Sequence, residues 1–260
     1  MKSALRILYT GLKIEIKTRI AYRMDFLVSS LLRLFTELFI PLLTLLIYRT
    51  GRSFPGWTIY EVLLIQSVFL ISKGIAFPFL WGVVWNTMDK VREGTFDLIL
   101  LKPHSPILIT ISSSFDSEEA SRLIGGIVLF IYSADRLGGL PLFSYLKLFL
   151  MVLLSVLVIS SFAILMTSVT FKWIGNSRLF EIFENISLIS QYPFSIYTKA
   201  FRDVFTMIVP IGMIGFIPAS VFLDKEVTGL SFSILACIAL LFLSVFIWRY
   251  MIKKYSSAGG

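Results

Sequence analysis

Residues 146–171 read LKLFLMVLLSVLVISSFAILMTSVTF, an apolar run interrupted only by the charge of Lys147. A helix needs about 20 predominantly apolar residues to cross the roughly 30 Å hydrocarbon core of a bilayer. The run is long enough, and it lacks the strict alternation that is typical of outer-membrane barrel strands. It therefore predicts a membrane-spanning helix, which Lys172 and Arg178 close on the cytoplasmic side.

The composition of the whole chain agrees with a membrane protein. Of its 260 residues, 57% are hydrophobic and 15% are charged, with a mean hydropathy of +0.85. Soluble domains carry about 25% charged residues. No stretch between the apolar runs is long enough to build a soluble domain. We therefore expect one all-α, polytopic integral membrane domain.

Six transmembrane helices are predicted along the chain. Residues 26–48 and 230–252 are clear spans, whereas residues 57–88 would form a helix of roughly 45 Å that must tilt or protrude. The third span has the shortest apolar core, residues 123–132, and should continue toward Leu140. The predicted organisation of the single domain is an interfacial helix (1–24), spans 1 and 2 (25–88), a cytoplasmic loop (89–106), spans 3 and 4 (107–171), and spans 5 and 6 (178–252).

The N-terminal segment predicts an amphipathic helix that lies on the membrane surface. Apolar residues recur there at helical spacing, and the basic residues lie mostly on the rest of the helix surface. A signal peptide would instead need an unbroken apolar core. The stripe consists of Leu5, Leu8, Leu12, Ile16 and Ile20.

The fifth region, residues 179–223, is broken by Pro193, Pro210 and Pro218. Two arrangements keep both termini cytoplasmic. Either residues 179–200 lie at the inner interface and residues 205–223 cross, or the first piece crosses and the second re-enters from outside. Lys199 and Arg202 favour the first arrangement by the positive-inside rule.

The basic residues set the orientation and exclude nucleic acid as a partner. They gather at the ends of the apolar runs rather than in a stripe interleaved with aromatics, so the net charge of +8 reflects cytoplasmic loops. We expect a multi-pass protein of the cytoplasmic (inner) membrane with both termini cytoplasmic. The solitary Cys237 and His104 provide no basis for a metal site, a disulfide or a catalytic triad, and we expect no enzymatic site or bound cofactor.

Charged residues inside the predicted spans are candidate functional groups, because burying a charge in lipid costs at least about 2.5 kcal/mol. These are Arg33, Glu37 and Lys73. Arg33 and Glu37 are four residues apart and are expected to pair on one helix face. Structural roles are favoured for all three. Asp116, Glu118 and Glu119 are interpreted as a solvated helix start on the cytoplasmic side.

The loop of residues 89–106 contains a short amphipathic stretch between Gly94 and Pro103. Its charged and apolar residues suit insertion into a cleft on another protein, and a helix lying on the membrane is the alternative. No GxxxxGK[ST] phosphate loop is present, so any ATP hydrolysis would belong to a partner.

Three local patterns give the chain a resemblance to type-2 ABC (ABC-2 type) transporter permeases, in the branch once catalogued as a domain of unknown function. The first pattern, AYRMDF at residues 21–26, includes Tyr22, Arg23 and Asp25 at the entrance to the first span. The second comprises Arg92, Glu93, Gly94, Phe96, Asp97, Leu100, Leu101, Lys102 and Pro103. The third comprises Tyr192, Pro193, Ile196 and Tyr197, followed by Pro210 and Pro218.

The resemblance implies a function and a set of partners. Residues 92–103 would form the coupling element that docks on a nucleotide-binding ATPase subunit, which binds the ATP and magnesium. The N-terminal helix would lie beside that subunit, and a second permease, identical or related, would complete a dimer among membrane lipids. The region after Tyr197 would form re-entrant helices capping the outer end. The aromatic-rich spans, with 24 Phe in the chain, would line an apolar path, so the expected substrate is amphipathic: a lipid, glycolipid, peptide or drug-like molecule. A secondary transporter or channel and a membrane-embedded lipid enzyme are the alternatives.

Overall fold

The computed structural model describes residues 2–173 and 178–256, and all regular structure in these ranges is helical. Four helices are long and apolar enough to cross a membrane: α2 (Arg23–Arg49), α3 (Ile59–Arg92), α7 (Leu142–Thr170) and α11 (Leu230–Ile252). They coincide with four of the predicted spans. The predicted third span corresponds to the 16-residue helix α6 (Ser121–Arg136), which is shorter than the expected crossing toward Leu140.

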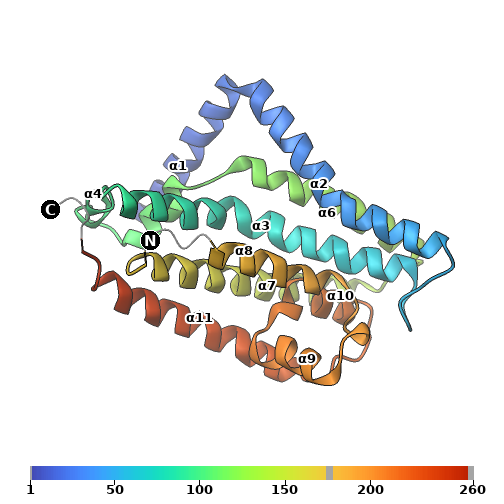
Figure 1. The fold of residues 1–260 in the computed structure, drawn as a ribbon. Coiled ribbons are helices and arrows are strands. Elements are labelled where there is room, and N and C mark those ends of the chain that lie inside the picture. The colour runs from blue at the N-terminus through green and yellow to red at the C-terminus, as the bar shows by residue number, and fades with distance from the viewer. Residues whose placement is uncertain (1, 174–177, 257–260) are drawn as a thin grey trace.

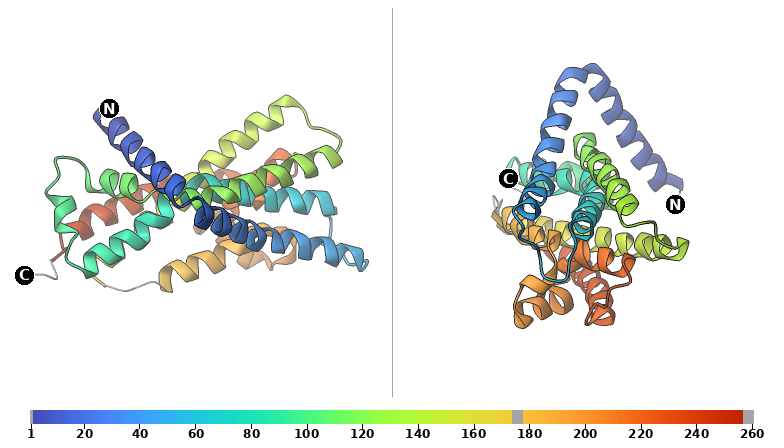
Figure 2. Two further views of the ribbon diagram at one scale, coloured as in Figure 1. Left: turned by 90° about the horizontal axis from the view of Figure 1, so that it is seen from above. Right: turned by 90° about the vertical axis from the view of Figure 1, so that its right-hand side faces the viewer.

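Helix α3 is the centre of the molecule, with α6 and α7 packed along it. Figure 1 shows α3, α7 and α11 running side by side, and Figure 2 shows the same bundle from above and from one end. The short helix α4 (Asp97–Leu100) and the C-terminal end of α11 lie at one end of the bundle. The short helices α9 (Lys199–Asp203) and α10 (Phe216–Phe222) lie toward the opposite end.

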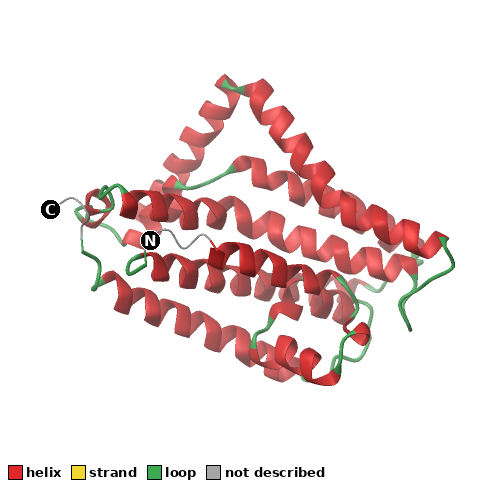
Figure 3. Ribbon diagram, viewed as in Figure 1, coloured by secondary structure: helices red, strands yellow, loops and turns green. Residues whose placement is uncertain are grey.

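Helices α1 (Lys2–Ala21) and α2 form an inverted V that stands away from the bundle (Figures 1 and 3). The chain turns at Tyr22, α1 packs on α5 (Pro106–Ser113), and α2 packs on α6. Within the predicted apolar stripe, Leu12 is half-buried while Ile16 and Ile20 are exposed. The side chains of Leu5 and Leu8 fall outside the described residues. Much apolar surface on this V is thus uncovered by the chain itself.

Two glycines allow α6 to lie directly on α3. A Cβ at Gly126 of α6 would approach the Ile71 backbone nitrogen to 2.8 Å, and one at Gly74 of α3 would collide with the Leu123 backbone. Small residues permit such close backbone approach where lipid supplies no hydrophobic drive for association. The neighbouring Gly125 would meet only the flexible end of Leu34, at 3.1 Å. The close contact between α3 and α6 therefore depends on Gly74 and Gly126, and not on Gly125.

The segment that precedes α6 is held across α3 near Pro78. The Asp116 amide donates to the Pro78 carbonyl at 2.8 Å, and Gly82 leaves room for the backbone of Ser114. This contact positions the short 3-10 helix η1 (Ser117–Ala120), with its acidic residues, beside α2 and α3. The residues between α5 and α6 are thereby held against the helical bundle.

The fifth region consists of short pieces, as its prolines predict. Helix α8 (Arg178–Ser187) runs beside α3 and α7 in the bundle (Figure 1). No continuous helix covers residues 205–223 in the described chain, which favours the arrangement in which that segment re-enters rather than crosses as one span. The pieces after α8 are η2 (Leu188–Gln191), η3 (Phe194–Ile196), α9, the π-helix η4 (Val204–Ile208), η5 (Ile211–Ile214) and α10.

Candidate functional site

Helix α4 is anchored to the end of the bundle by two buried side chains. Phe96, immediately before α4, is fully buried. Its ring centroid lies 5.0 Å from that of Phe171 and 5.5 Å from that of Tyr255. Ile99 is 4% exposed in the same apolar cluster, which Trp248 of α11 also joins. The anchor connects α4 to the ends of α3, α7 and α11. Any displacement of α4 would therefore act on the ends of three candidate spans.

The opposite face of α4 is uncovered and apolar. Leu98 is 63% exposed, and Leu101, just after the helix, is 81% exposed. The predicted element of residues 92–103 thus divides into an anchored face and a presented face. Its other members are exposed or half-buried, with Gly94 in the left-handed conformation (φ +71°) that glycine tolerates. The exposed or half-buried members are Arg92, Glu93, Gly94, Asp97, Leu100, Lys102 and Pro103.

Two clefts flank this end of the molecule. One, of about 610 Å³, lies between α1 and the segment from Lys102 to Ser113, with Arg6 and His104 on its walls. The other, of about 540 Å³, lies between Leu100, the start of α5 and the last turns of α11, including Arg249 and Lys253. The element of residues 92–103 therefore contributes Lys102 and Pro103 to one cleft and Leu100 to the other, and both clefts carry basic side chains.

A buried ionic cluster joins α2, η1 and α6. Arg122 Nε lies 2.9 Å from Glu37 and 3.2 Å from the fully buried Glu119. Arg33 pairs with Glu119 and lies 3.5 Å from Glu118. The predicted Arg33–Glu37 pair is not among the ion pairs of the described residues. Arg33 instead pairs with Glu119 of η1, and Glu37 pairs with Arg122 of α6, because the face of α2 that carries both residues is turned toward η1 and α6.

The acidic run before α6 is not the solvated helix start that the sequence suggested. Glu118 and Glu119 are buried, and their carboxylates lie between arginines from α1 and α2. The pKa of Glu119 is raised above its usual value, because the effect of burial exceeds the opposing effect of the Arg122 and Arg33 guanidiniums. Arg19 adds contacts from α1: it lies 2.6 Å from Glu15 and pairs with Glu118. The cluster fixes the two arms of the V onto the bundle.

The third intramembrane charge, Lys73, extends this ionic contact to α8. Its ammonium lies 3.0 Å from Glu184, and its side chain is only 1% exposed. The Phe77 ring contacts both Lys73 and Arg122, whose cations lie 5.1 and 4.7 Å from the ring centroid. One aromatic ring thus links the Lys73–Glu184 pair to the ionic cluster around Arg122. The charges are paired, as a structural role predicts.

The region predicted to cap the outer end is organised around Ser190, which the sequence did not single out. Its hydroxyl accepts from the Gly215 amide at 2.8 Å and from the Phe216 amide at 3.2 Å. These amides begin α10 and have no partner within the helix. The Phe194 and Phe216 rings stack at 4.5 Å nearby.

The predicted gate residues take different positions around this centre. Pro193, Pro210 and Pro218 are buried, Tyr192 and Tyr197 are half-buried, and Ile196 is exposed. By contrast, Tyr22, Arg23 and Asp25 at the start of α2 are exposed. Ser190 and Glu184 are among the residues that sequence reasoning missed, and for Glu184 the only signal was the charge of Lys73, which needed a partner.

Comparison with known proteins assigns the family. The family described as "ABC-2 family transporter protein" matches residues 31–259. No curated protein and no solved structure matches the chain. The matched range includes α4, its anchor, most of the ionic cluster and the whole fifth region.

Proposed function

Because the chain belongs to the family of ABC-2 transporter proteins, we propose that it is the membrane-spanning permease subunit of an ATP-driven exporter. A separate ATPase subunit binds ATP and magnesium, and a second permease, the same or a related chain, completes the pathway. The exported substrate is amphipathic. The protein lies in the cytoplasmic membrane, and its own role is conformational rather than catalytic.

The proposed topology has six crossings. Helices α6 and α8 lie beside α3 in the bundle, so we assign them to the two crossings that are shorter than the other four. The α9–α10 segment then re-enters from outside, where backbone that is not helical is tolerated because protein surrounds it. Helix α4 and the ends of α1 and α11 that lie with it are cytoplasmic. The many basic residues of these segments support that orientation.

The observation that carries the proposal is the division of α4 into a buried and a presented face. Phe96 and Ile99 hold it to α3, α7 and α11, while Leu98 and Leu101 are left for a partner. Closure of two ATPase subunits on ATP would move α4, and the aromatic contact with Phe171 would pass that movement to α7. Coupling requires the ATPase to contact two permease states differently.

The experiment compares exposed leucines at the two ends of the bundle. Leu98→Asp and Leu101→Asp should abolish co-purification of the ATPase subunit and its stimulation by the permease. Leu142→Asp is the matched control, since Leu142 is 86% exposed at the first turn of α7. There an acidic residue is favourable for the helix.

Charge reversal provides a second, milder perturbation of the same face. Glu93→Lys or Asp97→Lys should uncouple hydrolysis from transport while the permease still folds. Wild-type coupling in the leucine and the charge variants, with all of them folded, would reject α4 as the docking element. Loss of coupling in Leu142→Asp alone would place the docking surface at the other end.

A further inference from the structure

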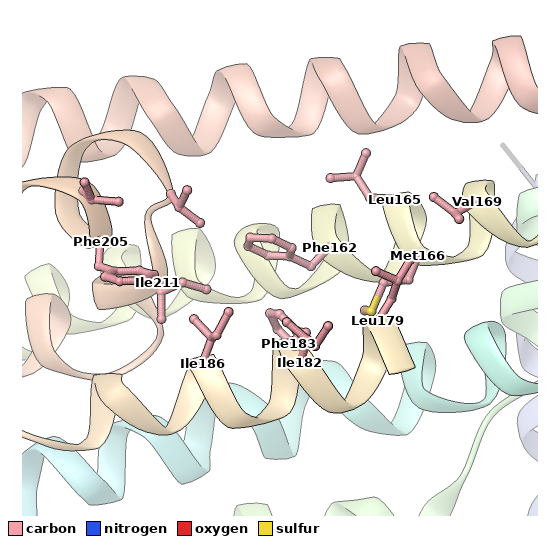
Figure 4. Close-up of a pocket in the computed structure, with 12 residues that line it drawn as sticks. Phe162, Leu165, Met166, Val169, Leu179, Ile182, Phe183, Ile186, Phe205 and Ile211 are labelled. Atoms are coloured by element: carbon pink, nitrogen blue, oxygen red, sulfur yellow. The ribbon is translucent and has the colours of Figure 1, made fainter. Parts of the chain in front are cut away.

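A long apolar groove lies on the side of the molecule, away from α4 and the ionic cluster. It encloses about 370 Å³, within the range of ligand-binding pockets. Figure 4 shows side chains from α7, α8 and the segment after α9 converging on it. Every one of the lining side chains is apolar, and they include Phe162, Leu165 and Val169 of α7 and Leu179, Ile182 and Ile186 of α8.

The shape of the groove suits one extended apolar chain. Its α7 wall runs from Phe162 to Val169 and its α8 wall from Leu179 to Ile186, about 10 Å along each helix. Residues 204–211 close one end (Figure 4). Ile182 is 53% exposed on the rim, so the groove opens to the outside of the molecule. Since α7 is a candidate membrane span, that outside is hydrocarbon.

The other end of the groove carries positive charge. Val169 and Leu179 lie at that end, and Lys172 follows Val169 by three residues while Arg178 directly precedes Leu179. Both basic side chains are exposed. Trp173, 53% exposed beside Lys172, is the residue type that settles at the level of lipid headgroups. An apolar groove with two exposed basic residues next to one end in the sequence complements an amphiphile that has one bound acyl chain and an anionic head.

We propose that this groove binds an anionic membrane phospholipid, with one acyl chain along α7 and α8 and the phosphate near Lys172 and Arg178. The face of α8 opposite the groove carries Glu184, the partner of Lys73. A seated chain would therefore support α8 from one side while the ion pair holds it from the other. Binding needs only the membrane-embedded permease, so it does not depend on an ATPase partner or on transport.

The test uses a phospholipid with a photoreactive acyl chain and a phosphatidylglycerol head, reconstituted with the full-length chain in vesicles of neutral lipid. After illumination, labelled peptides are mapped by mass spectrometry. We expect labelling at Ile182 and Leu165 that saturates and is displaced by unlabelled phosphatidylglycerol. Labelling at Phe242 of α11, which is 70% exposed, should rise linearly, as it does for freely exchanging lipid.

Two pairs of charge reversals identify the headgroup contact. Lys172→Glu with Arg178→Glu should weaken saturable labelling by about 10- to 30-fold, because each basic residue near a membrane attracts anionic lipid. Lys13→Glu with Lys17→Glu makes the same change in net charge on exposed positions of α1 and should leave it unaltered. Leu165→Trp, which fills the groove, should abolish labelling at Ile182 without changing the headgroup cations.

Three results would overturn the proposal. Equal, non-saturating labelling at Ile182 and Phe242 would mean that the groove holds only freely exchanging lipid. Displacement by phosphatidylcholine as effective as by phosphatidylglycerol would remove the role of the cations. Crosslinks from Ile182 to a second copy of the chain would show that a protein surface fills the groove.

Discussion

The Lys73–Glu184 ion pair should be more sensitive to loss of its carboxylate than to loss of its ammonium. The Lys73 side chain is 1% exposed, whereas Glu184 is 26% exposed. Glu184→Gln leaves a buried cation without its direct partner, which should lower the free energy of unfolding by about 3–5 kcal/mol. Lys73→Met leaves a carboxylate that is partly exposed rather than buried, so the loss of folding free energy should be smaller, about 1 kcal/mol. The double variant replaces the pair with uncharged groups and should be nearly neutral.

Thermal unfolding of the purified protein in detergent, followed by tryptophan fluorescence, measures these differences. Trp81 and Trp85 of α3 lie 4.4 and 5.7 Å from the Phe180 ring, so their emission reports on the seating of α8. In a chain of this size, 1 kcal/mol shifts Tm by about 2–4 °C. Glu184→Gln should therefore lower Tm by roughly 10 °C, and adding Lys73→Met should restore most of the loss.

An exposed ion pair serves as the matched control. Lys147 pairs with Asp224, whose side chain is 58% exposed. Asp224→Asn removes one charge at a position with φ of 53°, which asparagine tolerates, and should shift Tm by less than about 2 °C. Equal losses for the two single variants at the buried pair, or a double variant as unstable as Glu184→Gln, would refute the reasoning. So would a Glu184→Gln shift no larger than that of the control.

Two packing contacts yield further predictions. Gly126→Ala should lower the free energy of unfolding by about 1–3 kcal/mol, since its Cβ meets backbone of α3. Gly125→Ala should leave the free energy of unfolding unchanged or raise it slightly. Urea or thermal unfolding of both variants compares them directly, and equal effects would contradict the assigned contact. Ser190→Ala should cost about 1–3 kcal/mol by leaving the first amides of α10 unsatisfied. Protease sensitivity after residue 198 should rise with it, and an unchanged digestion pattern would show that Ser190 does not organise this segment.

The sequence predicted most of the long helices because apolar length alone defines them. Residues 146–171 and 230–252 lie close to the bounds of α7 and α11. The short amphipathic element that contains α4 was also predicted from sequence, since Gly94 and Pro103 bracket it, and its coupling role stays a prediction. Its division into buried residues (Phe96, Ile99) and exposed leucines (Leu98, Leu101) could not be predicted, because the rings that bury Phe96 belong to Phe171 and Tyr255, which are distant in sequence.

The electrostatic partners were the least predictable feature. Spacing of four residues suggested that Arg33 and Glu37 pair with one another, but buried charges find partners where helices meet. Here η1 lies across α3 at Pro78 and brings Glu119 to Arg33. That crossing depends on Gly82, which carries no signal of its own in a single sequence. The same contact explains why acidic residues before α6 are buried rather than solvated.

The most direct test of the permease assignment is photocrosslinking from α4 in native membranes. A photoreactive amino acid replaces Leu101 in one variant and Leu142 in another, and crosslinked proteins are identified by mass spectrometry. The account predicts that position 101, and not position 142, captures a subunit with a GxxxxGK[ST] phosphate loop. Crosslinks from position 101 to lipid alone, or capture of such a subunit from position 142 alone, would contradict it.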